Sequence, residues 1–171
     1  MKNTFLVAVA LLLFVGLYAQ NKNRVSVGLS YNKIEIAYRH SFAEKQIWVS
    51  PSFGVGNQDA NSNFDDIITE VKIGIPIFTF QKSSIYAQLN SGLYFANNNY
   101  YKTVAPFVGL NCGYEILFGN KKMHSVFTEI GYLYGKSEYK QKYYNDYISV
   151  SSTEIFILPP LSLKIGYGLN F

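Results

Sequence analysis

Alternation of apolar and polar residues at every second position runs through most of this sequence and constrains its fold more than any other feature. Successive side chains of a β-strand point to opposite faces, so this period predicts strands with one apolar and one polar face. The C-terminal segment shows it most clearly, because small or polar residues separate Leu161, Leu163, Ile165, Tyr167, Leu169 and Phe171. The chain is therefore predicted to be all-β.

Eight segments carry the alternation and are predicted to be strands: 24–31, 33–42, 47–56, 67–78, 85–95, 104–118, 125–135 and 161–171. Most of them reach the roughly 9–11 residues that a tilted membrane strand needs. After residue 20, no apolar run approaches the roughly 18 residues of a membrane helix. No repeat or linker divides the chain, so one domain is expected over residues 20–171.

The connections between these strands alternate in length. Short connections are expected at 43–46, 79–84 and 119–124, and longer ones at 57–66, 96–103 and 136–152. The connection at Asn32 is short, although it belongs to the second set. An even number of strands with short turns at one end and longer loops at the other is typical of outer-membrane barrels. Both termini then lie at the short-turn end, on the periplasmic side.

The N-terminal residues 1–19 are predicted to be a signal peptide. Lys2 precedes an uncharged apolar run over 5–18, and Ala19 is a suitable residue for cleavage. A run of this length fits a signal-peptide core and is short for a helix that crosses about 30 Å of hydrocarbon. An uncleaved membrane anchor is the alternative. The chain is therefore expected to be exported.

Two kinds of barrel share this strand pattern. A soluble lipocalin-like barrel places its apolar face inside, and a membrane barrel places it outside, against lipid. Charged residues are only 15% of the chain, against about 25% in ordinary soluble domains. The polar face is rich in Gly, Ser, Asn and Ala, which suit the crowded interior of a narrow barrel. Aromatic residues near both strand ends suggest two interfacial girdles. These features favour the membrane barrel.

The signal peptide, the eight alternating strands and the final IGYGLNF resemble the small outer-membrane β-barrel families of Gram-negative bacteria, of the OmpX and OmpA types. The resemblance is one of pattern rather than of a diagnostic motif. It implies an eight-stranded antiparallel up-and-down transmembrane β-barrel, monomeric, in the outer membrane and in contact with its lipid and lipopolysaccharide. It also implies that the barrel-assembly machinery reads a C-terminal signal made of Ile165, Tyr167, Leu169 and Phe171.

Two features depart from that family pattern. The first outer connection is very short, and Pro159–Pro160 precede the last strand. Proline has no N–H to donate to a sheet. The two prolines are therefore expected to mark a bulge or the start of the strand.

Charged residues on the polar face form the first candidate site: Glu35, Arg39, Glu70, Lys72, Glu115, Glu129 and Lys164. An unpaired charge in a low-dielectric interior costs several kcal/mol, so these groups are expected to pair across the lumen. Counting from the turn end places Arg39, Glu115 and Glu129 at similar depths. The favoured interpretation is a salt-bridge plug that closes the lumen, and the alternative is a proton or ion path.

The residues of catalytic type do not form a recognisable site. His40 and Ser41 are adjacent in a predicted strand, so their side chains point to opposite faces and cannot act as a nucleophile and its base. His124 is expected in an exposed short turn. The acidic residues of 57–66 match no calcium-loop spacing, and one cysteine excludes a Cys-based zinc site. No catalysis, cofactor or metal is expected.

The segment 136–152 is predicted to be the longest outer loop and a surface-contact site. Its tyrosines and lysines are Lys136, Tyr139, Lys140, Lys142, Tyr143, Tyr144 and Tyr147. Tyrosine gives a large amphipathic contact area at low entropic cost, and the lysines suit anionic partners such as lipopolysaccharide phosphates. An interfacial tyrosine belt is the alternative interpretation.

These features together predict a structural, adhesive or surface-contact protein without an open pore, with a possible extracellular partner at its outer loops. A net charge of +4 without a basic run argues against nucleic acid. Two alternatives stay open: a lipid A-modifying outer-membrane enzyme and a soluble periplasmic lipocalin-like barrel that binds a ligand.

Overall fold

The computed structural model describes residues 22–42, 47–57, 64–97, 102–145 and 148–171, so the predicted signal peptide lies outside the described residues. Its elements are β1 (Asn23–Ser30), β2 (Lys33–Ser41), β3 (Trp48–Gly56), β4 (Asp66–Thr79), β5 (Ser83–Asn97), β6 (Lys102–Phe118), the 3-10 helix η2 (Asn120–Lys122), β7 (His124–Asn145), β8 (Ile148–Ile157) and β9 (Leu161–Asn170). Among these elements, none is a helix long and apolar enough to cross a membrane.

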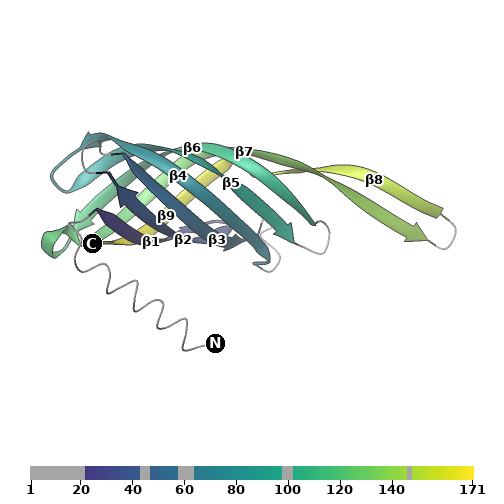
Figure 1. Cartoon of the computed structure of the whole chain (residues 1–171), viewed down its shortest axis with the longest axis horizontal. Helices are drawn as coiled ribbons and strands as arrows, with labels where there is room; N and C mark the ends of the chain where they lie inside the picture. Colours follow the sequence, from purple (N-terminus) through teal and green to yellow (C-terminus); the bar gives the residue numbers. More distant parts are fainter. Residues whose placement is uncertain (1–21, 43–46, 58–63, 98–101, 146–147) are drawn as a thin grey trace, which may run out of the picture.

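Eight of the strands close into an antiparallel barrel in the order β1-β2-β3-β4-β5-β6-β7-β9, and β9 pairs with β1 (Figure 1). The two chain ends meet at this seam, where Asn23 N–H donates to Phe171 O over 3.0 Å and Phe171 N–H donates to Asn23 O over 2.9 Å. Each strand pairs with its neighbours in sequence, apart from the insertion of β8. The predicted eight-stranded up-and-down β-barrel is confirmed.

The segment from 136 onward is where the prediction was wrong. In place of the loop predicted over 136–152, β7 continues to Asn145, and β8 pairs with it from Lys136↔Ile157 to Asn145↔Ile148. The two strands form a ribbon that extends well past the barrel wall (Figure 1). A ribbon outside the barrel has no core face to impose alternation, so the period-two signal that identified the other strands is missing from its first half.

The prolines lie at the boundary between this ribbon and the barrel. β8 and β9 pair one after the other with the same edge of β7, and Pro159 and Pro160 stand between them. Pairing continues across the interruption, because Leu158 N–H donates to Gly135 O over 3.0 Å and Leu133 N–H donates to Pro160 O over 2.7 Å. The prolines therefore precede the start of the last barrel strand, as predicted, and they divide a longer strand in two.

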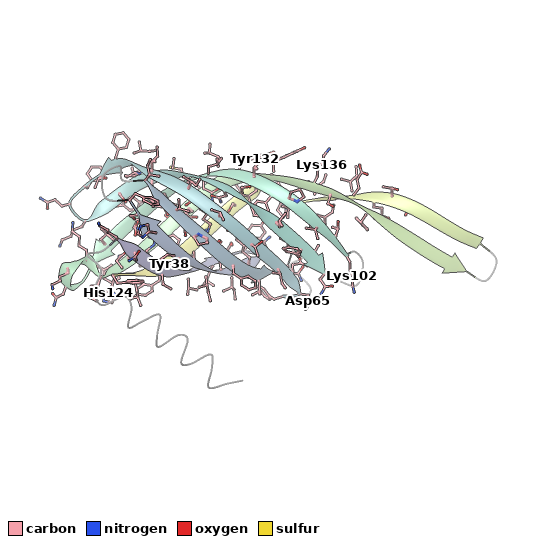
Figure 2. The ribbon with its side chains drawn as sticks, in the orientation of Figure 1. Tyr38, Asp65, Lys102, His124, Tyr132 and Lys136 are labelled. Atoms are coloured by element: carbon pink, nitrogen blue, oxygen red, sulfur yellow. The ribbon has the colours of Figure 1, made fainter. Side chains whose placement is uncertain are left out.

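The two faces of the barrel wall are the reverse of those in a soluble barrel. Large apolar side chains point outward, with Leu110 63% and Tyr132 61% exposed (Figure 2). Charged and amide side chains point inward, with Glu35 and Lys72 each only 3% exposed. A soluble ligand-binding barrel requires an apolar interior, so the lipocalin-like alternative is not supported. The predicted outward direction of the apolar face is confirmed.

Glycines on neighbouring strands make room for the large rings inside the barrel. Three interior rings stand directly opposite a glycine, in the pairs Trp48↔Gly74, Tyr86↔Gly113 and Phe127↔Gly166. A Cβ added to Gly74 would lie 2.1 Å from Trp48 Cζ2, and one added to Gly113 would lie 2.2 Å from Tyr86 Cζ. Because real Cβ atoms do not approach so closely, these rings fit only where the opposite residue has no side chain. Inside the barrel, each of these large rings therefore occupies the space that the opposite glycine leaves free.

Candidate functional site

Six charged side chains meet inside the barrel and are called here the balanced cluster: Lys33, Glu35, Glu70, Lys72, Glu129 and Lys164. Lys164 Nζ lies 2.8 Å from Glu129 Oε2 and 3.1 Å from Glu35 Oε1. Lys33 Nζ lies 2.9 Å from Glu70 Oε1, and Lys72 pairs with both Glu35 and Glu70. Three bases and three acids are thus linked in one network, in which the charges of the buried groups cancel.

A second group, called here the arginine cluster, consists of Arg24, Arg39 and Glu115. Arg24 pairs with Glu115, and Arg39 Nη1 lies 3.1 Å from Glu115 Oε2. Both guanidinium groups also lie over aromatic rings, Arg24 at 4.7 Å from the Phe127 centroid and Arg39 at 5.3 Å from that of Trp48. This cluster holds two cations against one anion.

Glu129 belongs to the balanced cluster and not, as depth counting predicted, to the level of Arg39 and Glu115. Its other contacts hold it there, because Tyr86 Oη and Gln88 Nε2 each donate to its carboxylate over 2.9 Å. Barrel strands tilt and their register shifts from strand to strand. Equal counts from the turn end therefore do not give equal depths.

Sequence reasoning missed two members of these clusters, Arg24 and Lys33. Arg24 is 5% exposed, and Lys33 pairs with both Glu35 and Glu70. Each residue lies two positions before an inward-facing residue of its own strand, Arg24 before Ser26 and Lys33 before Glu35, and so points to the same face. Extending the alternation to the first residue of each strand gives the signal that finds both of them.

An apolar cluster fills the other mouth of the barrel, beside the base of the ribbon. Its buried members are Ile68, Tyr94, Ala96, Ala105, Phe107, Phe156 and Leu158. Phe156 belongs to β8 and Leu158 follows it, so the ribbon strand itself contributes to the closure. The space remaining there is about 30 Å³, which is on the scale of one water molecule. Two different kinds of packing thus close the lumen, one ionic and one apolar.

The predicted surface-contact residues lie on the ribbon and not on a loop. Lys136 is exposed, whereas Tyr139 packs against the apolar cluster and its hydroxyl donates to Glu154 Oε2 over 2.6 Å. Tyr139 therefore supports the base of the ribbon. The other predicted side chains, those of Lys140, Lys142, Tyr143, Tyr144 and Tyr147, lie outside the described part of the chain.

The two histidines contact groups that hold them in place. His40 Nδ1 lies 2.7 Å from Asn23 Oδ1. His124 contacts the Tyr167 hydroxyl and stacks on Phe118, with 5.5 Å between ring centroids. The expectation that His124 lies in an exposed turn was wrong, because it begins β7 and is half-buried among these rings.

The acidic residues of the 57–66 segment are only partly described. Asp66 is 1% exposed and accepts hydrogen bonds from Tyr94 Oη and from the Asn97 backbone N–H, at 2.7 and 2.8 Å. It therefore ties β4 to β5. Over the described ranges, no group of three His, Cys, Asp or Glu side chains is placed to hold a metal ion.

The four residues of the predicted assembly signal follow the outward face of β9 to the chain end. Ile165 and Tyr167 are exposed, and Leu169 and Phe171 are half-buried. Phe171 lies just past β9 at the seam with Asn23. The alternation of the C-terminal segment predicted that these four residues share one face.

Comparison with known proteins finds solved structures of similar fold but no sequence family. A barrel from the de novo design of transmembrane β-barrels is similar, with 13% identity, a TM-score of 0.52 and coverage of 88% of this chain and 96% of that chain. A major outer membrane protein from Thermus thermophilus is also similar, with 12% identity, a TM-score of 0.51 and coverage of 88% and 98%.

No protein-family model and no curated protein matches the sequence. The resemblance to the OmpX-type and OmpA-type families therefore stays an expectation from the sequence pattern. At these identities the similarity concerns the fold alone. The chain has the fold of a closed, eight-stranded transmembrane β-barrel.

Proposed function

We propose that this protein is an outer-membrane β-barrel of a Gram-negative bacterium, exported through the N-terminal signal peptide. The observation that carries the proposal is the apolar exterior of a wall whose interior is ionic. Exposing apolar surface to water costs about 25 cal/mol per Å², and soluble monomers rarely expose large apolar patches. A closed barrel also satisfies its backbone hydrogen bonds without solvent, which hydrocarbon requires.

The distribution of aromatic side chains supports the same proposal. Phe118, His124 and Tyr167 pack together at the turn end, and exposed Tyr132 and Tyr134 lie toward the base of the ribbon (His124 and Tyr132 are labelled in Figure 2). Aromatic girdles of this kind flank the apolar band of outer-membrane barrels. The turn end is assigned to the periplasm and the ribbon to the cell surface.

Cell fractionation combined with protease treatment of intact cells tests this location and orientation. We expect the protein in the outer-membrane fraction, with cleavage confined to the ribbon and the neighbouring loops. The unboiled protein should also migrate differently from the boiled protein on a denaturing gel, because the closed barrel resists detergent. Recovery from the soluble periplasmic fraction, with one mobility on the gel, would contradict the proposal.

We further propose a structural or surface-contact role for the protein, with the ribbon as the contact element. The ribbon extends past the barrel wall, which closes through β1 to β7 and β9 without β8 (Figure 1). Residues 136–145 contain Lys136, Lys140 and Lys142, which favour an anionic partner such as lipopolysaccharide. Surface segments on a rigid scaffold commonly carry recognition. No catalytic role is part of this proposal.

Binding of the purified protein to lipopolysaccharide at two salt concentrations tests the contact role. Changing Lys136, Lys140 and Lys142 to Gln should weaken binding at low salt and leave the gel-shift behaviour intact. The control changes two exposed lysines of the short turns, Lys82 and Lys121, to Gln. Equal binding by the ribbon variant and the wild type would exclude the lysines as the contact. Hydrolysis or acyl transfer on labelled lipid A would instead favour the enzymatic alternative.

A further inference from the structure

Among the residues that the structure describes, the arginine cluster leaves one positive charge uncompensated inside the barrel. Glu115 is the acidic partner that the described residues bring to Arg24 and Arg39. The side chains of the two arginines are only 6% and 12% exposed. A guanidinium group stays protonated at any physiological pH, so loss of a proton cannot remove the excess. The balanced cluster has no such excess, because its three lysines face three glutamates.

A cavity of about 380 Å³ adjoins this cluster at the turn end of the barrel. Its lining includes Arg39, Glu115 and Trp48 on the barrel wall. Lys22 and Lys122, both exposed, add two more cations at its rim. Cavities of roughly 300–1,000 Å³ accommodate small ligands. The space beside the uncompensated charge is therefore large enough for a small anion and is bordered by further positive charge.

Hydrogen-bond donors for such an anion are present. Arg39 lines the cavity, and a guanidinium carries five N–H donors, of which the buried Nε of Arg39 has no hydrogen-bond partner among the described residues. Ser41, Thr79 and Ser84, each with a hydroxyl group, are also among the lining residues. Guanidinium groups pair strongly with carboxylate and phosphate oxygens.

Glu115 does not supply the missing negative charge. Its Oε1 already accepts from Arg24 and Arg39, and its Oε2 accepts from Arg39 Nη1 over 3.1 Å. Both oxygens are therefore occupied by the two guanidinium groups, and the sum of the three charges is still positive. An added anion would meet a net attraction at this site.

We propose that the turn-end cavity binds a small oxyanion of the phosphate type. Free phosphate and the phosphate headgroup of a lipid at the turn-end interface share the chemistry that the cavity recognises. This function goes beyond the membrane barrel and the ribbon contact, and it places the site at the opposite end from the ribbon.

The single tryptophan of the chain provides the measurement. Trp48 lines the cavity and its ring lies 5.3 Å from the Arg39 guanidinium carbon. We expect sodium phosphate, added at constant ionic strength to the protein in a non-ionic detergent, to change Trp48 fluorescence in a saturable way. A linear or absent response would overturn the proposal.

Variants separate this site from general charge effects. Arg39→Gln should weaken phosphate binding at least tenfold. This change also alters the surroundings of the Trp48 ring, so the rise in unfolding temperature on adding phosphate is a second measure of binding. The combined change Lys22→Gln and Lys122→Gln should weaken binding several-fold, and it carries the test if Arg39→Gln fails to fold. Lys102→Gln, at the opposite end (Figure 2), is the matched control and should bind as the wild type does. Unchanged affinity in the rim variant and in a folded Arg39→Gln protein would refute the site.

A second titration identifies the source of the anion. Short-chain phosphatidic acid is compared with inorganic phosphate and with the matching diacylglycerol, which lacks the phosphate. Tighter binding of phosphatidic acid, with competition by phosphate, assigns the site to a lipid headgroup. Saturation by inorganic phosphate alone assigns it to a free anion. An equal response to diacylglycerol would show that the cavity responds to the acyl chains and would overturn the proposal.

Discussion

Glu129 and Lys164 stand directly opposite each other on β7 and β9, with 2.8 Å between carboxylate oxygen and ammonium nitrogen inside the barrel. The same carboxylate accepts hydrogen bonds from Tyr86 and Gln88 on β5. Lys164 also reaches Glu35 on β2. This one pair therefore connects four strands across the lumen, and it links the seam side of the barrel to the opposite wall.

Neutralising one member of this pair should destabilise the barrel. Glu129→Gln leaves the buried Lys164 with less compensation, and breaking a buried pair costs about 3–5 kcal/mol. A double change that adds Lys164→Met should recover part of the loss, as expected for coupled residues. Urea unfolding in lipid vesicles, followed by the gel shift, measures both. Glu138→Gln, on the exposed ribbon part of β7, is the control. Additive effects of the two changes would argue against the coupling.

The close approach of Tyr86 to Gly113 should make that glycine intolerant of a side chain. In Gly113→Ala the new Cβ would lie 2.2 Å from Tyr86 Cζ, so the ring must move and its hydrogen bond to Glu129 is disturbed. Overpacking of this kind costs about 1–3 kcal/mol. Gly54→Ala is the control, because the atom nearest to its new Cβ, Ile34 O, would be 3.1 Å away. In the same unfolding measurement, Gly113→Ala should be less stable than Gly54→Ala. Equal stability of the two variants would contradict the packing argument.

The filled lumen should not conduct ions steadily. The balanced cluster occupies the interior with paired charges, and the apolar cluster leaves about 30 Å³ at the ribbon end. An eight-stranded barrel has room for little beyond its own side chains. Recordings in planar bilayers should therefore show no stable open level. A reproducible ohmic channel from the purified wild type would be inconsistent with a closed lumen.

The terminal Phe171 should matter for assembly through its side chain. Deleting it removes both the aromatic ring and the two backbone hydrogen bonds with Asn23. Phe171→Ala keeps the backbone seam and removes only the ring, so it separates a recognition signal from seam closure. We expect both variants to reach the outer membrane in lower yield, measured by immunoblot of fractions. A normal yield for Phe171→Ala would mean that the ring is not part of an assembly signal.

The ribbon of β7 and β8 is the part of the fold that the sequence pattern did not predict. Residues 125–135 alternate because one face meets the crowded interior and the other faces outward. The sequence of residues 136–145 does not alternate in this way, so the same strand continues without the pattern that would reveal it. Pro159 and Pro160 did indicate a strand boundary, because neither residue has an N–H to donate to β7.

The sequence by itself determined the all-β class, the eight wall strands and the polar inward face, because a side-chain period of two is a local property that each strand displays alone. It also predicted seven of the inward charges, from Glu35 to Lys164, although Arg24 and Lys33 were missed. Only the tertiary structure decided which of them meet. Glu129 joins Lys164 and not Arg39, and Arg24 shares Glu115 with Arg39, because tilt and register stagger set the relative depth of neighbouring strands and no single strand contains that information.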